Sequence, residues 1–286
     1  MVPHKFLFTI MAAVALLASA CTNDDDGIDN GKYLFLPQKI SIEDSLANNR
    51  LTTYTYEENS NRFAEITDTI RFVKNAAMFL NTTYSTIDYD EMGRVVKMTS
   101  QLKEAQNDST ETQRTVVYTF GYPYANWAVV IINIEDQSTG TAKTYLIEFN
   151  EKQQAVEFMY GEDQDKFVLF EYDNKGNILK TKDELGKEFY FSPDTKRGIY
   201  REVNMPQWFM NIVLNMPRSS VWPDTYDTYG TNNNCDKIEV LDVLAVNPSE
   251  KVLVRNYTTQ YSPFGYPISQ SDNLRFEIKV TYTKAY

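Results

Sequence analysis

Histidine is almost absent from this sequence, and the single copy, His4, lies near the N-terminus. Without an imidazole in the rest of the chain, a Ser-His-Asp or Cys-His catalytic arrangement has no group to accept the proton. The residue that most often binds zinc and other transition metals is missing as well. Paired carboxylates hydrolyse glycosides without histidine, but no motif marks two of the 39 acidic residues for that role. We therefore predict no enzymatic activity, no metal site and no cofactor.

Long apolar segments are also scarce, and the one that stands out lies at the N-terminus. Residues 6–17 are almost entirely apolar, and Lys5 precedes them. The small residues 18–20 follow and lead directly into Cys21. A bilayer-spanning helix needs about 20 apolar residues, whereas a secretory signal needs about 7–15 before its small-residue cleavage site. The pattern predicts a cleaved lipoprotein signal, residues 1–20, with diacylglycerol attached to the Cys21 sulfur.

An acidic run, Asp24, Asp25 and Asp26, comes shortly after Cys21. Such a run resembles the surface-export signal of Bacteroidetes lipoproteins. It also fits a solvated tether, because clustered like charges keep a chain extended. Both interpretations predict an acidic tether over residues 21–32. The acyl chains on Cys21 predict stable anchoring in the outer membrane, with the protein exposed at the cell surface.

The remaining composition limits the partners of the mature chain. With Cys21 acylated, Cys235 is the only other cysteine, so no intrachain disulfide can form, and we expect a partly buried structural thiol. The net charge of −11 and the pI near 4.7 make nucleic acid a poor partner, because phosphate binding depends on Lys and Arg. Residues 33–286 are predicted to form a single antiparallel β domain.

Residue types that favour β-strands are frequent, with 20 Tyr and 16 Phe in the chain. In the last segment, apolar Ile278, Val280 and Tyr282 alternate with polar residues, so one face of this strand is apolar. Antiparallel sheets tolerate one solvated face, whereas parallel sheets are covered on both. We expect the continuously apolar segment 129–132 to be a strand buried on both faces. The pattern predicts an all-β fold, a large antiparallel up-and-down meander that is strongly curled or barrel-like.

A degenerate repeat marks the hairpins of this meander. The segments 87–95 and 170–178 both read as a strand, Tyr-Asp-x-x-Gly and a second strand. Weaker copies lie at 54–62 and 147–155. Asp and Asn bond their own backbone in turns and Gly supplies a positive φ, so each copy predicts a tight hairpin.

One segment departs from the strand pattern. Residues 206–216 begin with Pro206 and are followed by Pro217, and proline at these places opens and ends a helix. The apolar surface of this helix is too broad for solvent, so we expect it to pack against the concave face or open end of the sheet. We take its apolar side chains and one tryptophan of the meander as candidate ligand-lining or plug residues: Trp208, Phe209, Ile212, Val213, Met216 and Trp127.

The lipoprotein signal, the Tyr-Asp-x-x-Gly hairpins at Tyr89 and Tyr172, and the Phe-Gly-Tyr-Pro run at 264–267 before the terminal strand occur together. In this combination the chain resembles a family of uncharacterised Bacteroidetes surface lipoproteins described as having a porin-like fold. The resemblance covers roughly residues 50–286. It implies a curled antiparallel sheet approaching a barrel and a role in binding apolar ligands. It supplies no catalytic residues.

These observations favour a non-enzymatic binding protein, anchored in the outer membrane, whose curled sheet encloses a small apolar or amphipathic, lipid-like ligand. The alternative is a glycan- or protein-interaction module that acts through surface loops. A barrel embedded in the membrane is a third hypothesis, but many strands carry charge on both faces, which a lipid-facing band excludes. The expected partners are the membrane, through the lipidated N-terminus, and the ligand. The sequence leaves the oligomeric state open.

Overall fold

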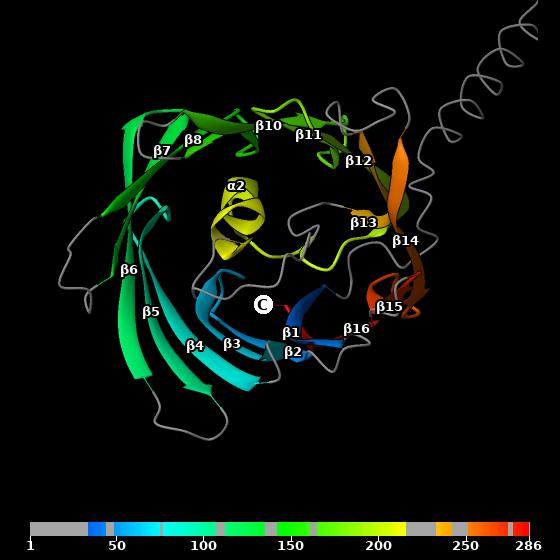
Figure 1. Ribbon diagram of the computed structural model, residues 1–286, viewed down its shortest axis with the longest axis horizontal. Coiled ribbons are helices and arrows are strands. Elements are labelled where there is room, and N and C mark those ends of the chain that lie inside the picture. The colour runs from blue at the N-terminus through cyan, green and yellow to red at the C-terminus, as the bar shows by residue number, and fades with distance from the viewer. Residues whose placement is uncertain are drawn as a thin grey trace, which may run out of the picture.

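The computed structural model describes residues 34–43, 49–74, 77–106, 112–134, 142–160, 165–215, 233–241, 251–273 and 277–285. These residues form a closed barrel of antiparallel strands, β1 to β16, in which consecutive strands pair and β16 returns to β1 (Figure 1). The strands are β1 (Phe35–Glu43), β2 (Asn49–Tyr56), β3 (Phe63–Lys74), β4 (Ala77–Tyr89), β5 (Val95–Gln106), β6 (Thr112–Tyr124), β7 (Trp127–Ile134), β8 (Lys143–Phe149), β9 (Ala155–Tyr160), β10 (Lys166–Tyr172), β11 (Ile178–Asp183), β12 (Glu188–Arg197), β13 (Asn233–Leu241), β14 (Val252–Tyr261), β15 (Pro267–Asp272) and β16 (Glu277–Lys284). The predicted antiparallel meander is confirmed, and it closes completely.

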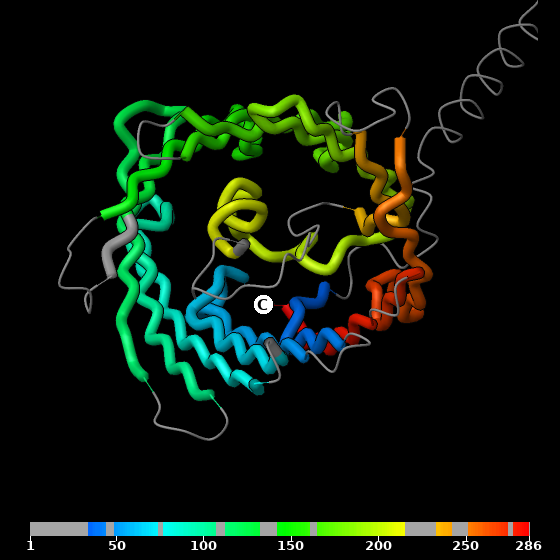
Figure 2. The backbone as a smooth tube through the Cα atoms, in the orientation of Figure 1, coloured from blue at the N-terminus to red at the C-terminus, as the bar shows by residue number. Residues whose placement is uncertain are grey.

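The barrel closes where the first and last strands meet, and Figure 2 shows these two parts of the chain side by side. Ile40 pairs with Val280 and Ile42 pairs with Ile278 across β1 and β16. All four side chains are buried. The apolar face predicted for the terminal strand is therefore confirmed, and it lines the interior. Closure also removes the unpaired sheet edges that would invite pairing with other chains.

The wall of the barrel has an apolar inner face and a polar outer face, as β4 and β5 show. Ile87 pairs with Met98, and both belong to the buried core. The adjacent residues Asp88 and Lys97 pair with each other and are exposed. Because successive side chains of a strand point to opposite faces, the core side is the lumen and the charged side is the exterior.

Strand β7 corrects one sequence prediction. Ala128 and Val130 are buried in the core, whereas Ile131 is 36% exposed. The apolar segment 129–132 is therefore not buried on both faces. The wall of a barrel is a single layer with the core on one side, so every second residue of a strand faces outward however apolar it is.

The copies of the repeat form tight hairpins at one end of the barrel, which we call the turn end. Each connects an even-numbered strand to the next strand, and the copies of the repeat supply residues 57–62, 90–94, 150–154 and 173–177. The first and last strands meet at this end as well, because the backbone N–H of Ala285 donates to the carbonyl oxygen of Leu34 over 2.8 Å. Leu34 therefore lies at the turn end.

The Tyr-Asp-x-x-Gly copies form the predicted turns. The Oδ1 atom of Asp173 accepts hydrogen bonds from the backbone N–H groups of Lys175 (2.9 Å) and Asn177 (2.8 Å). Gly176 has a φ of 88°, a left-handed conformation that any side chain would disfavour. The turn that begins at Asp90 repeats both hydrogen bonds. The repeat therefore encodes one turn geometry several times over.

The tyrosine of the repeat joins strands rather than closing the turn. The hydroxyl of Tyr89 donates to the carbonyl oxygen of Phe63 over 2.7 Å, and the hydroxyl of Tyr172 donates to that of Ala155 over 2.8 Å. In both cases a residue that ends one strand bonds the first residue of the strand before it. Two tyrosines outside the repeat, each two residues before the end of its strand, also donate to the first residue of the strand before: Tyr122 to Val95 and Tyr282 to Pro267. Burial raises the pKa of all these phenols, so they stay protonated donors.

Between β12 and β13 the chain enters the barrel, and we call its described part, residues 198–215, the plug. The plug holds α2 (Gln207–Asn211) and the 3₁₀ helix η1 (Val213–Asn215), and α2 lies inside the ring of strands in Figure 1. Its buried apolar and aromatic residues are Tyr200, Trp208, Phe209, Met210, Ile212, Val213 and Leu214. The prediction of a buried apolar helix is confirmed, although the helix is shorter than 206–216. No helix in the described part of the chain is long and apolar enough to cross a membrane.

Candidate functional site

A cavity of about 580 Å³ opens at the turn end, and we call it the turn-end pocket. Its walls are the hairpin turns and its inner side is the plug. The lining residues are Arg62, Met92, Gly93, Arg94, Lys152, Gln153, Gln154, Asn174, Lys175, Gly176, Asn204, Met205, Pro206 and Gln207. The volume falls within the range of about 300–1,000 Å³ that is typical of small-molecule sites.

Equivalent positions of the repeat line this pocket. The third and fourth residues of three turns are Met92 and Gly93, Lys152 and Gln153, and Lys175 and Gly176, and all of them are lining residues. Because the turns share one backbone geometry, each presents the same two positions toward the pocket. The repeat thus does more than close hairpins, since it places a set of turn residues around one opening.

Hydrogen bonds tie the plug to these turns. The backbone N–H of Asn204 donates to the carbonyl oxygen of Asn61 over 2.9 Å, and the backbone N–H of Trp208 donates to that of Gln153 over 3.1 Å. The side-chain amide of Gln207 donates to the carbonyl oxygen of Gly176 over 3.3 Å. The plug is therefore fixed to three separate hairpins, which makes the inner side of the pocket part of the barrel framework.

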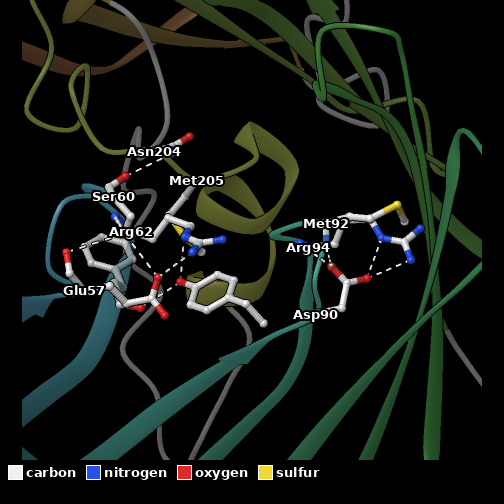
Figure 3. A network of polar contacts seen from close by, with 10 residues as sticks. Glu57, Ser60, Arg62, Asp90, Met92, Arg94, Asn204 and Met205 are labelled. Carbon is white, nitrogen blue, oxygen red and sulfur yellow. Dashed lines mark hydrogen bonds and ion pairs between the residues drawn. The ribbon is translucent and has the colours of Figure 1, made fainter.

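Arg62 forms one corner of the pocket (Figure 3). Its guanidinium pairs with the Glu57 carboxylate over 2.8 Å and lies 4.4 Å from the centre of the Tyr89 ring. A Cβ atom on Gly93 would come within 2.5 Å of the Arg62 Nη1 atom. The missing side chain at Gly93 thus lets an arginine from one hairpin reach the turn of the next.

Arg94 forms the neighbouring corner (Figure 3). Its guanidinium pairs with the Asp90 carboxylate over 2.8 Å and lies 4.6 Å from the centre of the Tyr122 ring. The backbone N–H of Arg94 also bonds Asp90, and this hydrogen bond is the main reason why the pKa of the Asp90 carboxyl is lowered. Asp90 therefore stays ionised near neutral pH and keeps the guanidinium in a fixed position.

The lining residues carry an excess of positive charge. Four of them are basic, Arg62, Arg94, Lys152 and Lys175, and none is acidic. Glu57 and Asp90 each form an ion pair with one of the two arginines. Lys152 and Lys175 are both exposed. The turns that supply these residues also carry acidic side chains, namely Glu57, Glu58, Asp90, Glu91, Glu151 and Asp173, so the positive charge belongs to the lining and not to the turn end as a whole.

The structure separates the residues that the sequence grouped as candidates. Trp208 lies at the centre of the plug, where its ring stacks on Phe149 with 5.9 Å between centroids and contacts Phe120 and Tyr122. Trp208, Phe209, Ile212 and Val213 are buried in the core and do not line the pocket. Met216 falls outside the described residues.

Trp127 is the candidate that the structure does not bring to the plug. It is only partly buried, and the next residue, Ala128, points into the core. Since neighbouring side chains of a strand point to opposite faces, Trp127 faces the exterior of β7. Trp127 and Trp208 therefore do not lie together, and aromatic content alone does not reveal the face on which a strand residue lies.

Two of the lining residues occupy a repeated position that is visible in the sequence. In the copies at 147–155 and 170–178, a lysine occupies the third position of the turn. The repeat predicts a turn at these positions, but it does not predict that the lysines, Arg62 and Arg94 line one pocket. Cys21, Asp24, Asp25 and Asp26 lie outside the described residues, so their predicted roles remain predictions.

The titratable groups of the described residues offer little other chemistry. No group of three or more His, Cys, Asp or Glu residues among them is arranged to hold a metal ion. Cys235 is buried, and burial raises the pKa of its thiol to about 12. The thiol is thus protonated near neutral pH and is a poor nucleophile.

No protein-family model matches this chain, and no curated protein matches it significantly. Among solved structures it is similar to a porin-like protein from Bacteroides uniformis ATCC 8492, known from a crystal structure at 2.32 Å resolution. The two chains share 15% sequence identity with a TM-score of 0.49, and the match covers 87% of this chain and 98% of the other.

Proposed function

We propose that this protein is a non-enzymatic binding protein, held at the outer membrane by a lipid anchor on Cys21, that takes a polar ligand into the turn-end pocket. The observation that carries this proposal is the pocket itself, about 580 Å³ in volume and lined by basic and amide side chains. Such a lining supplies hydrogen-bond donors and positive charge in a fixed arrangement, which is what a polar ligand requires.

The outer face of the barrel favours a tethered protein over one that is embedded in lipid. The number of strands is even, as in bacterial outer-membrane barrels. However, charged side chains lie on the exterior, for example Asp88 beside Lys97 on β4 and β5. On β10 to β12, Lys180 pairs with Glu171 over 2.5 Å and lies 3.8 Å from Glu188. An apolar band around the whole barrel cannot contain such groups.

The interior favours a plugged barrel over an open channel. The core cluster combines inward residues of the wall with residues of the plug. Phe120 on β6 and Phe149 on β8, the two strands that flank β7, both contact Trp208. Aromatic packing of this kind fixes an element in place through large buried areas. We therefore assign the barrel a scaffold role, in which the wall and plug position the pocket at the turn end.

The anchor and the pocket share one end of the molecule. Leu34 lies at the turn end, and the proposed tether, residues 21–32, reaches at most roughly 40 Å when fully extended. Acylation of Cys21 would thus keep the pocket close to the membrane surface. The acidic residues Asp24 to Asp26 then serve as the export signal and as a solvated spacer.

The pocket lining supports one of the two kinds of ligand predicted from the sequence. An apolar, lipid-like ligand needs an apolar surface, whereas the described apolar side chains of the lumen pack against the plug. The polar lining supports the alternative, a glycan-type ligand captured at the surface. The proposal that no catalysis takes place rests on the lack of histidine beyond His4 and on the buried Cys235 thiol.

A direct comparison of ligand classes tests this proposal. The mature chain without its acyl groups is screened on a glycan array, and the same preparation is titrated with a fluorescent fatty acid. We expect carbohydrate binding and no displacement of the fatty-acid probe by carbohydrate. Binding of the fatty acid, together with lipid retained in native mass spectra and no carbohydrate bound, would falsify the polar-ligand proposal and restore the apolar one.

A further inference from the structure

An apolar row crosses the exterior of four consecutive strands, β7 to β10. The residues that alternate with it, among them Val130, Ile147 and Phe158, pack in or against the core, so the row itself faces outward. It consists of four side chains that lie directly opposite one another from strand to strand: Val129, Leu146, Met159 and Phe167. Direct cross-strand register makes these side chains one continuous strip.

Further apolar and aromatic side chains widen this strip. Ile131 on β7 and Leu169 on β10 are exposed on the same side of their strands. Trp127 lies opposite Tyr124, which is 71% exposed. We call the strip together with these four residues the apolar face. A contiguous exposed apolar surface is typical of an interaction site, and Trp and Tyr are enriched among the residues that contribute most to binding.

Two carboxylates lie within this surface. Glu148 on β8 and Glu157 on β9 are directly opposite each other, and Trp127 and Leu169 are their outer neighbours in register. The side-chain amide of Asn126 donates to Glu148 over 3.2 Å, but neither carboxylate forms an ion pair within the described part of the chain. Like charges that face each other across strands are destabilising, so a cation supplied from outside would stabilise this pair.

The charges on and beside the apolar face indicate which kind of partner fits it. Lys180 and Lys182 on the next strand, β11, already pair with Glu171 and Glu188. A second copy of the chain, docked symmetrically through this face, would bring four glutamates together without an added cation. A lipid surface would remove water from the two carboxylates and give them no partner. A segment that carries both apolar and basic side chains meets neither objection.

We propose that the apolar face is a docking surface for another protein, which presents apolar side chains flanked by Arg or Lys. The basic side chains pair with Glu148 and Glu157, and the apolar ones cover the strip. An amphipathic helix suits the spacing, because its pitch of about 5.4 Å is close to the roughly 4.8 Å between neighbouring strands. A helix that lies across β7 to β10 thus places about one turn over each strand. This surface is on the outer wall and is separate from the turn-end pocket.

Fluorescence anisotropy with three labelled helical peptides tests this inference on the mature chain without its acyl groups. The first peptide has a Leu stripe flanked by Arg, the second has Glu in place of Arg, and the third keeps Arg but has Ser in place of Leu. We expect the first to bind at least about tenfold more tightly than either of the others, because only it matches both the charge and the apolar strip.

A pair of double variants tests the charge. Glu148→Gln with Glu157→Gln should weaken binding of the Arg-Leu peptide by about tenfold. Glu65→Gln with Asp88→Asn removes the same charge from exposed positions of β3 and β4 and should change binding by less than about twofold. The first variant should keep or raise the melting temperature, since it removes a like-charge contact.

A second pair of variants tests the apolar part. Ile131→Ser with Leu169→Ser should weaken binding of the same peptide by about tenfold. Val252→Ser with Leu253→Ser, at exposed apolar positions of β14, is the matched control and should change it by less than about twofold.

Three results would overturn this inference. Equal binding of the Arg-Leu and Arg-Ser peptides, or no loss in either variant of the apolar face, would reduce the interaction to general charge attraction. A dimer in sedimentation that the Ile131 and Leu169 variant dissociates would make a second copy the occupant. Flotation with phosphatidylcholine vesicles that the same variant abolishes would make it lipid. All of these results leave carbohydrate binding at the turn-end pocket untouched, so the proposed function is tested separately.

Discussion

At the scale of single residues, the tyrosine hydroxyls of the turn end join strands that the hairpin turns alone do not connect. The hydroxyl of Tyr172 donates to the carbonyl oxygen of Ala155, and Ala155 is fully buried. Replacing Tyr172→Phe should lower the free energy of unfolding by about 1–2 kcal/mol, because a buried carbonyl oxygen loses this donor. Tyr84→Phe, at a position that is 46% exposed, is the matched control and should change stability by less than about 0.5 kcal/mol. Urea unfolding of both variants measures the difference, and equal stabilities would show that the hydroxyl contributes nothing.

Single residues also show which contacts a sequence motif predicts and which contacts it does not. Asp173 and Gly176 could be assigned to a turn because their roles depend on backbone bonds within five consecutive residues. The contact between Arg62 and Gly93 joins two different hairpins, and its existence depends on the register of β3 and β4. Local chemistry is readable from a single segment, whereas contacts across hairpins require the completed barrel.

At the scale of elements, the plug was the most predictable part of the interior. Its apolar surface required burial, and Pro206 marked where the helix begins. The end of the helix was less predictable, because α2 stops at Asn211 and η1 continues the chain, although no proline or glycine interrupts 207–215. The prediction that β7 is buried on both faces was wrong for a related reason, since an apolar run does not show how many faces of a strand the core covers.

Replacing Trp208→Ala tests whether the plug is a fixed part of the barrel. The ring is fully buried against Phe149, Phe120 and Tyr122, so its loss should cost about 3–5 kcal/mol and lower the melting temperature by roughly 10 °C. Leu185→Ala, at a position that is 61% exposed, should leave melting almost unchanged. Thermal unfolding followed by circular dichroism measures both. Unchanged melting of the Trp208 variant, combined with altered ligand retention, would identify the plug as a movable lid instead.

At the scale of the whole molecule, alternating polarity predicted an antiparallel sheet, but closure depended on something that no segment shows. Ile40 and Ile42 must meet Val280 and Ile278 in register, and these pairs lie at opposite ends of the chain. The face that each strand turns to solvent follows from this closure, which is why the exterior position of Trp127 was not foreseen. The pocket has the same origin, because its lining comes from four hairpins and the plug.

The anchor is also a property of the whole molecule, since Cys21 and the barrel act together only through the tether. Replacing Cys21→Ser should release the protein from washed membranes, because the acyl chains supply the binding energy and the charged barrel exterior supplies little. Changing Asp24, Asp25 and Asp26 to alanine is the matched control, which should leave acylation and membrane retention intact while reducing cleavage by external protease. Immunoblots of membrane and soluble fractions measure both outcomes. A Cys21→Ser protein that still sediments with washed membranes would show that the barrel itself associates with lipid, and the outer wall, with its charges at Asp88 and Lys97, would then have to face another protein rather than water.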